Sequence, residues 1–165
     1  MILIIDGNNL IGRKITTVSD GHMIKKDLTL KIVEYVAMTG RKVKIVFDGI
    51  EDTNYPDGII FKGVQIFYAK AGGNADERIK NMVKNVSYAR DITVVSSDRD
   101  LRTYVSGRGA KVMTSEAFRS ELAKLKFSEE KETKESNPKI DNVSEWLEFF
   151  GIEQKPQDSK ETSRK

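Results

Sequence analysis

The chain opens with the stretch Met1-Ile-Leu-Ile-Ile-Asp-Gly-Asn-Asn-Leu-Ile-Gly12. Residues 2–5 are all apolar and mostly β-branched, which predicts a strand buried on both faces, as in a parallel sheet. The strand runs directly into Asp6, a glycine and two asparagines. Ligands of open α/β sheets bind just beyond the carboxyl ends of the strands. This position suits Asp6, Asn8 and Asn9 to metal or phosphate chemistry, although an isolated Asp-Gly pair is also a common turn.

The composition excludes several kinds of site. With no cysteine and the single histidine His22 among 165 residues, the chain has no disulfide, thiolate zinc site or cysteine nucleophile. A multi-histidine zinc site is excluded too, and a Ser-His-Asp triad is disfavoured. No apolar run approaches the ~20 residues of a membrane span, and no signal peptide precedes the first strand. We therefore expect a soluble cytoplasmic protein without membrane contact.

The charge is unevenly distributed. The 28 Lys and Arg residues exceed the 25 Asp and Glu residues, and the formal net charge is +3. The basic surplus lies within residues 1–126, whereas residues 127–165 are acidic overall. A basic surface around an acidic pocket suits a bound polyanion, but mild basicity alone is common in unrelated proteins.

Extended and helical patterns alternate along residues 1–126. After the first strand, strands are expected at 43–47, 64–68, 92–95 and 110–113. Helices are expected at 22–39, 101–107 and 116–126, the last with Ser115 as its cap. A further helix is expected to begin at Asn74, with an inward face that reaches Val86. Residues 50–63 are rich in turn-forming residues and form an excursion from the sheet. This alternation indicates right-handed βαβ crossovers and an α/β fold whose mostly parallel sheet lies between helices.

The composition changes after this domain. Residues 127–139 are rich in Ser, Glu, Lys and Thr, which predicts a flexible linker, and residues 153–165 are expected to be disordered. Residues 140–152 are expected to include a short amphipathic helix. Its apolar residues are Trp146, Leu147, Phe149 and Phe150. So much aromatic surface is expected to dock on the main domain or on a partner.

Acidic turns follow three of the predicted strands. They contain Asp6, Asp48 and the pair Asp98 and Asp100. Because the carboxyl ends of parallel strands lie on the same side of a sheet, we expect these acids to gather at one rim. Asp76 lies three residues before the inward-facing Ile79 and projects over the same rim. Each acid alone is at least as well explained as a turn residue or helix cap, but their joint placement favours a site.

Converging carboxylates repel one another unless a cation lies between them. Mg²⁺ and Mn²⁺ prefer oxygen ligands, and one or two such ions support phosphodiester hydrolysis without a histidine base. The acids therefore predict a Mg²⁺ or Mn²⁺ site, with no small organic cofactor.

Four segments together resemble the YacP-like NYN-domain family, a branch of the PIN-domain nucleases. They are Asp6-Gly-Asn-Asn-Leu10, Phe47-Asp-Gly49, Gly73-Asn-Ala-Asp-Glu-Arg-Ile79 and Val95-Ser-Ser-Asp-Arg-Asp-Leu101. The resemblance covers residues 1–126, and the Trp146-Leu147 helix is similar to that family's tail. It implies a PIN-like three-layer α/β/α sandwich with strand order 3-2-1-4-5. It also implies a Mg²⁺- or Mn²⁺-dependent endoribonuclease acting on single-stranded RNA, with messenger RNA as the substrate and the ribosome as a further candidate partner.

The resemblance also assigns roles to residues. The metal-binding and catalytic acids that it implies are Asp6, Asp76, Asp98 and Asp100, with Asn8, Asn9, Asp48 and Ser97 in support. Basic residues near the rim are candidates for holding the RNA backbone, or else belong to solvated helix faces: Arg13, Lys14, Arg78, Arg99 and Arg102. Tyr55 and Phe61 either stack on unpaired bases or pin the excursion to the core.

Three functions remain in competition at this point. The leading hypothesis is a metal-dependent endoribonuclease, active in RNA decay or processing linked to translation. The second is an RNA- or ribosome-binding module whose acidic site is weak or vestigial. A small-molecule phosphohydrolase or phosphoacceptor domain is disfavoured, because the acid-x-acid motif, the P-loop and the dinucleotide glycine pattern are all missing.

Overall fold

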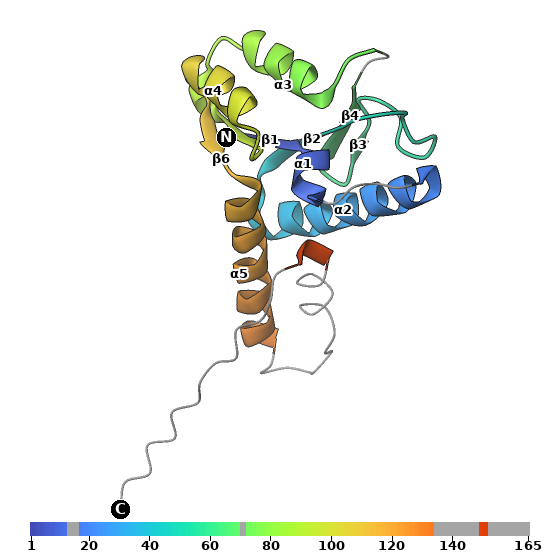
Figure 1. The fold of residues 1–165 in the computed structure, drawn as a ribbon. Coiled ribbons are helices and arrows are strands. Elements are labelled where there is room, and N and C mark those ends of the chain that lie inside the picture. The colour runs from blue at the N-terminus through green and yellow to red at the C-terminus, as the bar shows by residue number, and fades with distance from the viewer. Residues whose placement is uncertain (13–16, 70–71, 134–148, 152–165) are drawn as a thin grey trace, which may run out of the picture.

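The structure, a computed structural model, describes residues 1–12, 17–69, 72–133 and 149–151. A six-stranded sheet lies between helices (Figure 1). The strands are β1 (Ile2–Asp6), β2 (Lys42–Phe47), β3 (Ile60–Phe61), β4 (Val64–Tyr68), β5 (Ile92–Val95) and β6 (Lys111–Met113). The helices are α1 (Gly7–Ile11), α2 (Val18–Thr39), α3 (Ala75–Lys84), α4 (Arg99–Gly107) and α5 (Ser115–Thr133), with a 3₁₀ turn at Ala89–Asp91.

The sheet has the strand order β3-β4-β2-β1-β5-β6. All neighbouring strands are parallel except β3, which pairs antiparallel with β4 at the edge. If the short β3 is set aside, this is the predicted 3-2-1-4-5 order. The α/β fold class is therefore confirmed, with β1 at the centre of the sheet.

The side chains of β1 alternate between two apolar layers. Leu3 and Ile5 belong to the cluster formed with α1, α2 and α5, whereas Ile4 belongs to the cluster formed with α3 and α4. Figure 1 shows these two helical layers on opposite faces of the sheet. A strand covered on both faces needs apolar residues at every position, which explains why residues 2–5 lack a polar alternation. By the same alternation, Asp6 continues the Ile4 side, toward α3 and α4.

Two short elements were not predicted. The expected loop after β1 is the five-residue helix α1, whose N-cap is Asp6 and which ends at Gly12 with φ +70°. The excursion contains β3, and Tyr55 and Phe61 make an edge-to-face contact at 5.0 Å while packing on the core. Of the two alternatives for these aromatic residues, the structure shows the second: they pin the excursion.

Several predicted boundaries and contacts are corrected. Helix α2 begins at Val18, before the predicted start, and α3 ends at Lys84. Val86 lies beyond α3 and is 39% exposed, so it does not belong to the inward face. Thr114, not Ser115, caps α5, because the Ala117 N–H donates to the Thr114 hydroxyl at 3.1 Å.

Two described residues near the C-terminus, Phe149 and Phe150, pack on the main domain. Helix α5 continues to Thr133, into the segment expected to be a linker. Phe150 is 7% exposed within the α2–α5 cluster and Phe149 packs against it, so this end docks on its own chain. The rest of the predicted linker, Trp146 and Leu147, and the tail lie outside the described residues. Within the described part of the chain, none of the helices is long and apolar enough to cross a membrane.

Candidate active site

Asp6 is a buried carboxylate at the end of the central strand. Its Oδ1 accepts the Asn9 N–H at 3.0 Å, its Oδ2 accepts the Ser96 hydroxyl at 3.1 Å, and the residue is 5% exposed. Burial raises the pKa of Asp6 to about 6; the nearby charges of Asp76 and Asp48 add to this rise, and the two hydrogen bonds oppose it. The carboxylate is therefore held in place but is costly to ionise.

Ser96 connects two of the predicted acids, and it was not predicted from the sequence. It is fully buried after β5, where its hydroxyl donates to Asp6 and accepts the Asp98 N–H at 3.1 Å. The pairing of Ile5 with Val95 in the parallel register brings the next residues, Asp6 and Ser96, side by side. Strand order combined with register was the signal that could have found it.

The other predicted acids lie at the starts of α4 and α3. Asp98 is the N-cap of α4 and accepts the Leu101 N–H at 2.7 Å, and Asp100 lies exposed in the first turn of that helix. Asp76 lies in the first turn of α3. Partial burial raises the pKa of Asp76, as do the charges of Asp98, Asp48 and Asp100, against the lowering effect of Lys80. Acids from the ends of β1, β2 and β5 and from the start of α3 therefore share one electrostatic neighbourhood.

Asp48 fastens the loop after β2 to its neighbours. Its Oδ1 accepts the Ala75 N–H at 2.6 Å, and its own N–H donates to Asn8 Oδ1 at 3.0 Å. The Lys25 ammonium donates to the Asp48 carbonyl at 2.6 Å; burial lowers the pKa of Lys25, and the charges of Asp48 and Asp52 oppose this. Lys25 was also missed, because a lysine on a helix gives no sign in the sequence of the distant carbonyl it meets.

Asn9 joins the loops that surround Asp6. Its side-chain Oδ1 accepts the Ser97 N–H at 2.8 Å and the hydroxyl of the fully buried Ser115 at 2.6 Å. The Ser97 hydroxyl accepts the Ser115 N–H at 3.0 Å and donates to Glu116, a bond that lowers the pKa of Glu116. The predicted supporting residues Asn8, Asn9, Asp48 and Ser97 thus form the frame around the acids, and Glu116 is an addition.

The predicted basic residues differ in what they contact. Both terminal nitrogens of Arg78 pair with Asp57 at 2.8 Å, and the guanidinium lies 4.8 Å from the Phe67 ring centre. Its Nη1 also donates to the Tyr68 carbonyl. Arg78 therefore holds β4 to α3 and the excursion. Arg99 is exposed on α4, and Arg102 Nε donates to the Asp98 carbonyl at 3.4 Å. Arg13 and Lys14 lie outside the described residues.

The donor chemistry of the site fits a hard divalent cation. Carboxylate, amide and backbone oxygens are what Mg²⁺ and Mn²⁺ prefer, and a cation would relieve the like charges that raise the pKa values of Asp6 and Asp76. Among the described residues, no three acidic or histidine side chains are arranged to hold one ion together. Mg²⁺ is commonly bound by only one or two carboxylates together with water and substrate phosphate, so such a grouping is not required.

Comparison with known proteins places this arrangement in a family. The model of the YacP-like NYN domain matches residues 3–149. The uncharacterized protein YacP of Bacillus subtilis (strain 168) is 31% identical over 121 residues, which are 66% of this chain and 67% of that protein. The crystal structure of Rae1 (YacP) from Bacillus subtilis matches with a TM-score of 0.66 and 24% identity, over 82% of this chain and 80% of that one. The crystal structure of a mutant of Rae1 gives the same TM-score and identity, over 90% of this chain and 91% of that one. The chain belongs to the YacP-like NYN domain family, within the PIN-like nucleases.

Proposed function

We propose that this protein is a divalent-metal-dependent endoribonuclease that hydrolyses phosphodiester bonds in single-stranded RNA. The observation that supports it most is the shared neighbourhood of Asp6, Asp48, Asp76, Asp98 and Asp100 at the carboxyl end of a parallel sheet. Such a group of acids costs stability and is rarely kept for structure alone. Membership of a PIN-like nuclease family supports the same conclusion.

In this proposal the chain contributes positioned oxygens and a binding surface. Asp6, Asp76, Asp98 and Asp100 would supply the ligands for one or two cations, directly or through water, while Ser96 and Asn9 orient the Asp6 carboxylate. The bound cation supplies activation of water and stabilisation of the leaving oxygen. Arg99 and Arg102 flank the acids on α4 and provide positive charge for the RNA backbone. Messenger RNA in the cytoplasm is the proposed target, in decay or processing linked to translation, with the ribosome as a candidate partner.

Cleavage of a labelled, unstructured RNA tests the proposal. The purified protein is compared in Mn²⁺, in Mg²⁺ and in chelator, beside the variants Asp98→Asn and Asp91→Asn. Asparagine retains the oxygen that caps α4, so Asp98→Asn is expected to fold normally and lose internal cleavage. Asp91, exposed in the 3₁₀ turn, serves as the control with the same charge change and should cleave like the wild type. Equal cleavage by both variants would contradict the proposed site.

The alternative is an RNA- or ribosome-binding module with a weak or vestigial acidic site. One observation favours it, since no three acids among the described residues are arranged around a single point. RNA binding that persists in chelator, with no internal cuts at any metal concentration, is its expected result.

A further inference from the structure

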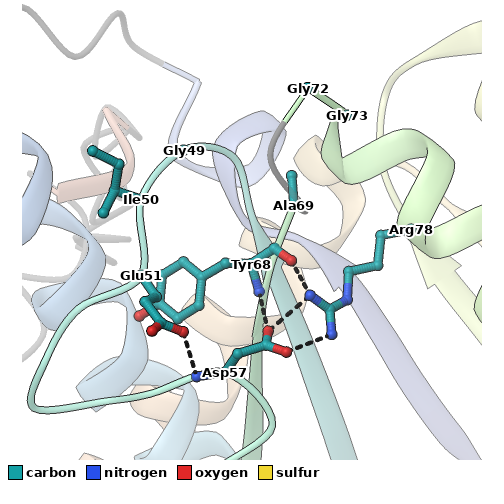
Figure 2. A pocket seen from close by; sticks show the side chains of 9 residues that line it. All are labelled: Gly49, Ile50, Glu51, Asp57, Tyr68, Ala69, Gly72, Gly73 and Arg78. Atoms are coloured by element: carbon teal, nitrogen blue, oxygen red, sulfur yellow. Dashed lines mark hydrogen bonds and ion pairs between the residues drawn. The ribbon is translucent and has the colours of Figure 1, made fainter.

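A pocket of about 520 Å³ opens directly beside the proposed cleavage site (Figure 2). Its lining residues are Gly49, Ile50, Glu51, Asp57, Tyr68, Ala69, Gly72, Gly73 and Arg78. One border follows Asp48 along the chain, and the other leads through Asn74 into the helix of Asp76. The bond from the Ala75 N–H to Asp48 Oδ1 joins the two borders. A strand of RNA with a phosphate at the acids therefore has this pocket as its neighbour.

Two of the charged groups in the pocket are already engaged with each other. Arg78 and Asp57 form a two-pronged ion pair, and Asp57 Oδ1 also accepts the Tyr68 N–H at 2.8 Å. Glu51 differs, because only its Oε2 accepts a hydrogen bond, from the Asp57 N–H at 3.1 Å. The other carboxylate oxygen of Glu51 accepts no hydrogen bond from the described residues. The pocket thus offers a carboxylate oxygen as an acceptor, which suits N–H donors rather than phosphate.

The remaining lining suits a flat ring. Ile50 is 80% exposed, and Figure 2 shows it across the pocket from Arg78. Gly49 and Gly72 have φ values of +85° and +81°, so glycine is favoured at both, and neither residue adds a side chain to the lining. The volume lies within the range of ligand pockets, about 300–1,000 Å³. An apolar side chain at the edge and bare backbone beside it fit the face and rim of a nucleobase.

We propose that this pocket binds an unpaired guanine of the RNA, read by the Glu51 carboxylate. Guanine is the base whose Watson–Crick edge carries two adjacent donors, N1–H and the N2 amino group, which match a carboxylate. Adenine and cytosine each pair one amino donor with a ring acceptor, and the N3–H of uracil lies between two carbonyls. Single-stranded RNA is commonly recognised through these edges. The inference rests on the proposed function, because the base is taken to belong to the strand that is cleaved.

Binding of the four nucleoside 5′-monophosphates, followed by amide shifts in NMR spectra, tests the pocket without any cleavage. Guanosine monophosphate is expected to shift the amides of Gly49, Gly72 and Gly73 and to bind about tenfold more tightly than the other three, as for a hydrogen bond to a charged group. Glu51→Gln should abolish this preference. Glu77→Gln removes the same charge at an exposed position outside the pocket and should preserve it.

The possible results separate the pocket from the nuclease. Equal affinity for the four nucleotides, shifts confined to other surfaces, or no shifts at all would each overturn the guanine pocket. None of these results depends on cleavage, so the binding experiment tests the guanine pocket even if the protein cuts no RNA. In Mn²⁺, Glu51→Gln should still cut RNA but lose its preference for sites beside guanine, whereas Asp98→Asn should stop cutting altogether.

Discussion

At the scale of single residues, the buried carboxylate of Asp6 lowers the stability of the folded protein while it places an oxygen ligand in the proposed site. The carboxylate is 5% exposed and lies near Asp48 and Asp76, so its ionised form is disfavoured in the folded protein. Ser96 and Asn9 offset only part of that cost. The folded protein therefore holds a negative charge that would be more stable in water, and binding of a cation would recover the difference.

The pH dependence of stability should show this cost. Below a pH of about 4 Asp6 is protonated in both states. Between about pH 4 and its folded pKa of about 6, Asp6 ionises in the unfolded state but keeps its proton in the folded state, so the folded state loses stability as the pH rises, and the loss levels off above a pH of about 6. In Asp6→Asn this loss is absent, so the stability of the variant relative to wild type should rise by about 2–3 kcal/mol across that interval. One lost hydrogen bond, from Asn9 or Ser96, adds a constant offset.

Urea unfolding in chelator at a series of pH values measures this difference. Asp91→Asn, at an exposed position, should track the wild type throughout. A stability difference between Asp6→Asn and wild type that does not change with pH would show that burial does not raise the pKa of Asp6.

At the scale of elements, α1 is the piece that positions the asparagines. Asp6 caps its start, Gly12 ends it in the left-handed conformation, and Arg119 donates to the carbonyl of Leu10 at 3.0 and 2.6 Å. Gly7 lets the helix approach β2, since a Cβ there would lie 2.5 Å from the Phe47 ring. The helix is too short to be stable alone, so these contacts determine its position.

Gly7→Ala should therefore disturb both stability and the site. The clash with Phe47 should cost about 1–3 kcal/mol and shift Asn8 and Asn9, which reduces RNA cleavage by the folded protein. Gly107→Ala is the matched control in α4, where an added Cβ meets nothing within 4 Å. It should be neutral or slightly stabilising. Thermal unfolding and cleavage assays on both variants measure these effects, and equal stability of the two would argue against the close approach of α1 and β2.

At the scale of the whole molecule, residues near the C-terminus, Phe149 and Phe150, contribute to the core of the main domain. Helices α2 and α5 meet through the contact of Tyr35 with Phe118, whose ring centres lie 5.2 Å apart, and Arg41, between α2 and β2, forms an ion pair with Glu121 of α5 at 2.8 Å. Phe150 joins the same cluster although it lies far along the chain. The face opposite the α3–α4 layer is thus closed by α1, α2, α5 and the segment of Phe149 and Phe150.

Phe150→Ala should destabilise the protein by about 2–4 kcal/mol, because it removes a buried ring and leaves a cavity. Leu30→Ala, on the exposed side of α2, should change stability by less than about 0.5 kcal/mol. Chemical unfolding of both variants measures this. An unchanged midpoint for Phe150→Ala would mean that this segment does not pack on the domain in solution.

Apart from the short elements α1 and β3, the main strands and helices and the sheet between helices could be predicted from the amino-acid sequence alone. A doubly buried strand requires a continuous apolar run, and residues 2–5 provide it. Strand ends marked by Asp6, Asp48 and Asp98 predicted one rim, because parallel strands end on the same side. These features are local or follow from topology, so the sequence pattern is enough to find them.

The meeting of particular side chains is a property of the tertiary structure. Ser96 reaches Asp6 through the register of β1 and β5, and Lys25 reaches the Asp48 carbonyl across a helix and a strand. Arg78 is committed to Asp57, although by sequence alone it looked equally available to RNA. Phe150 closes the core rather than a partner's surface. Such contacts join residues far apart in the chain, and they depend on register and packing, which no local pattern specifies.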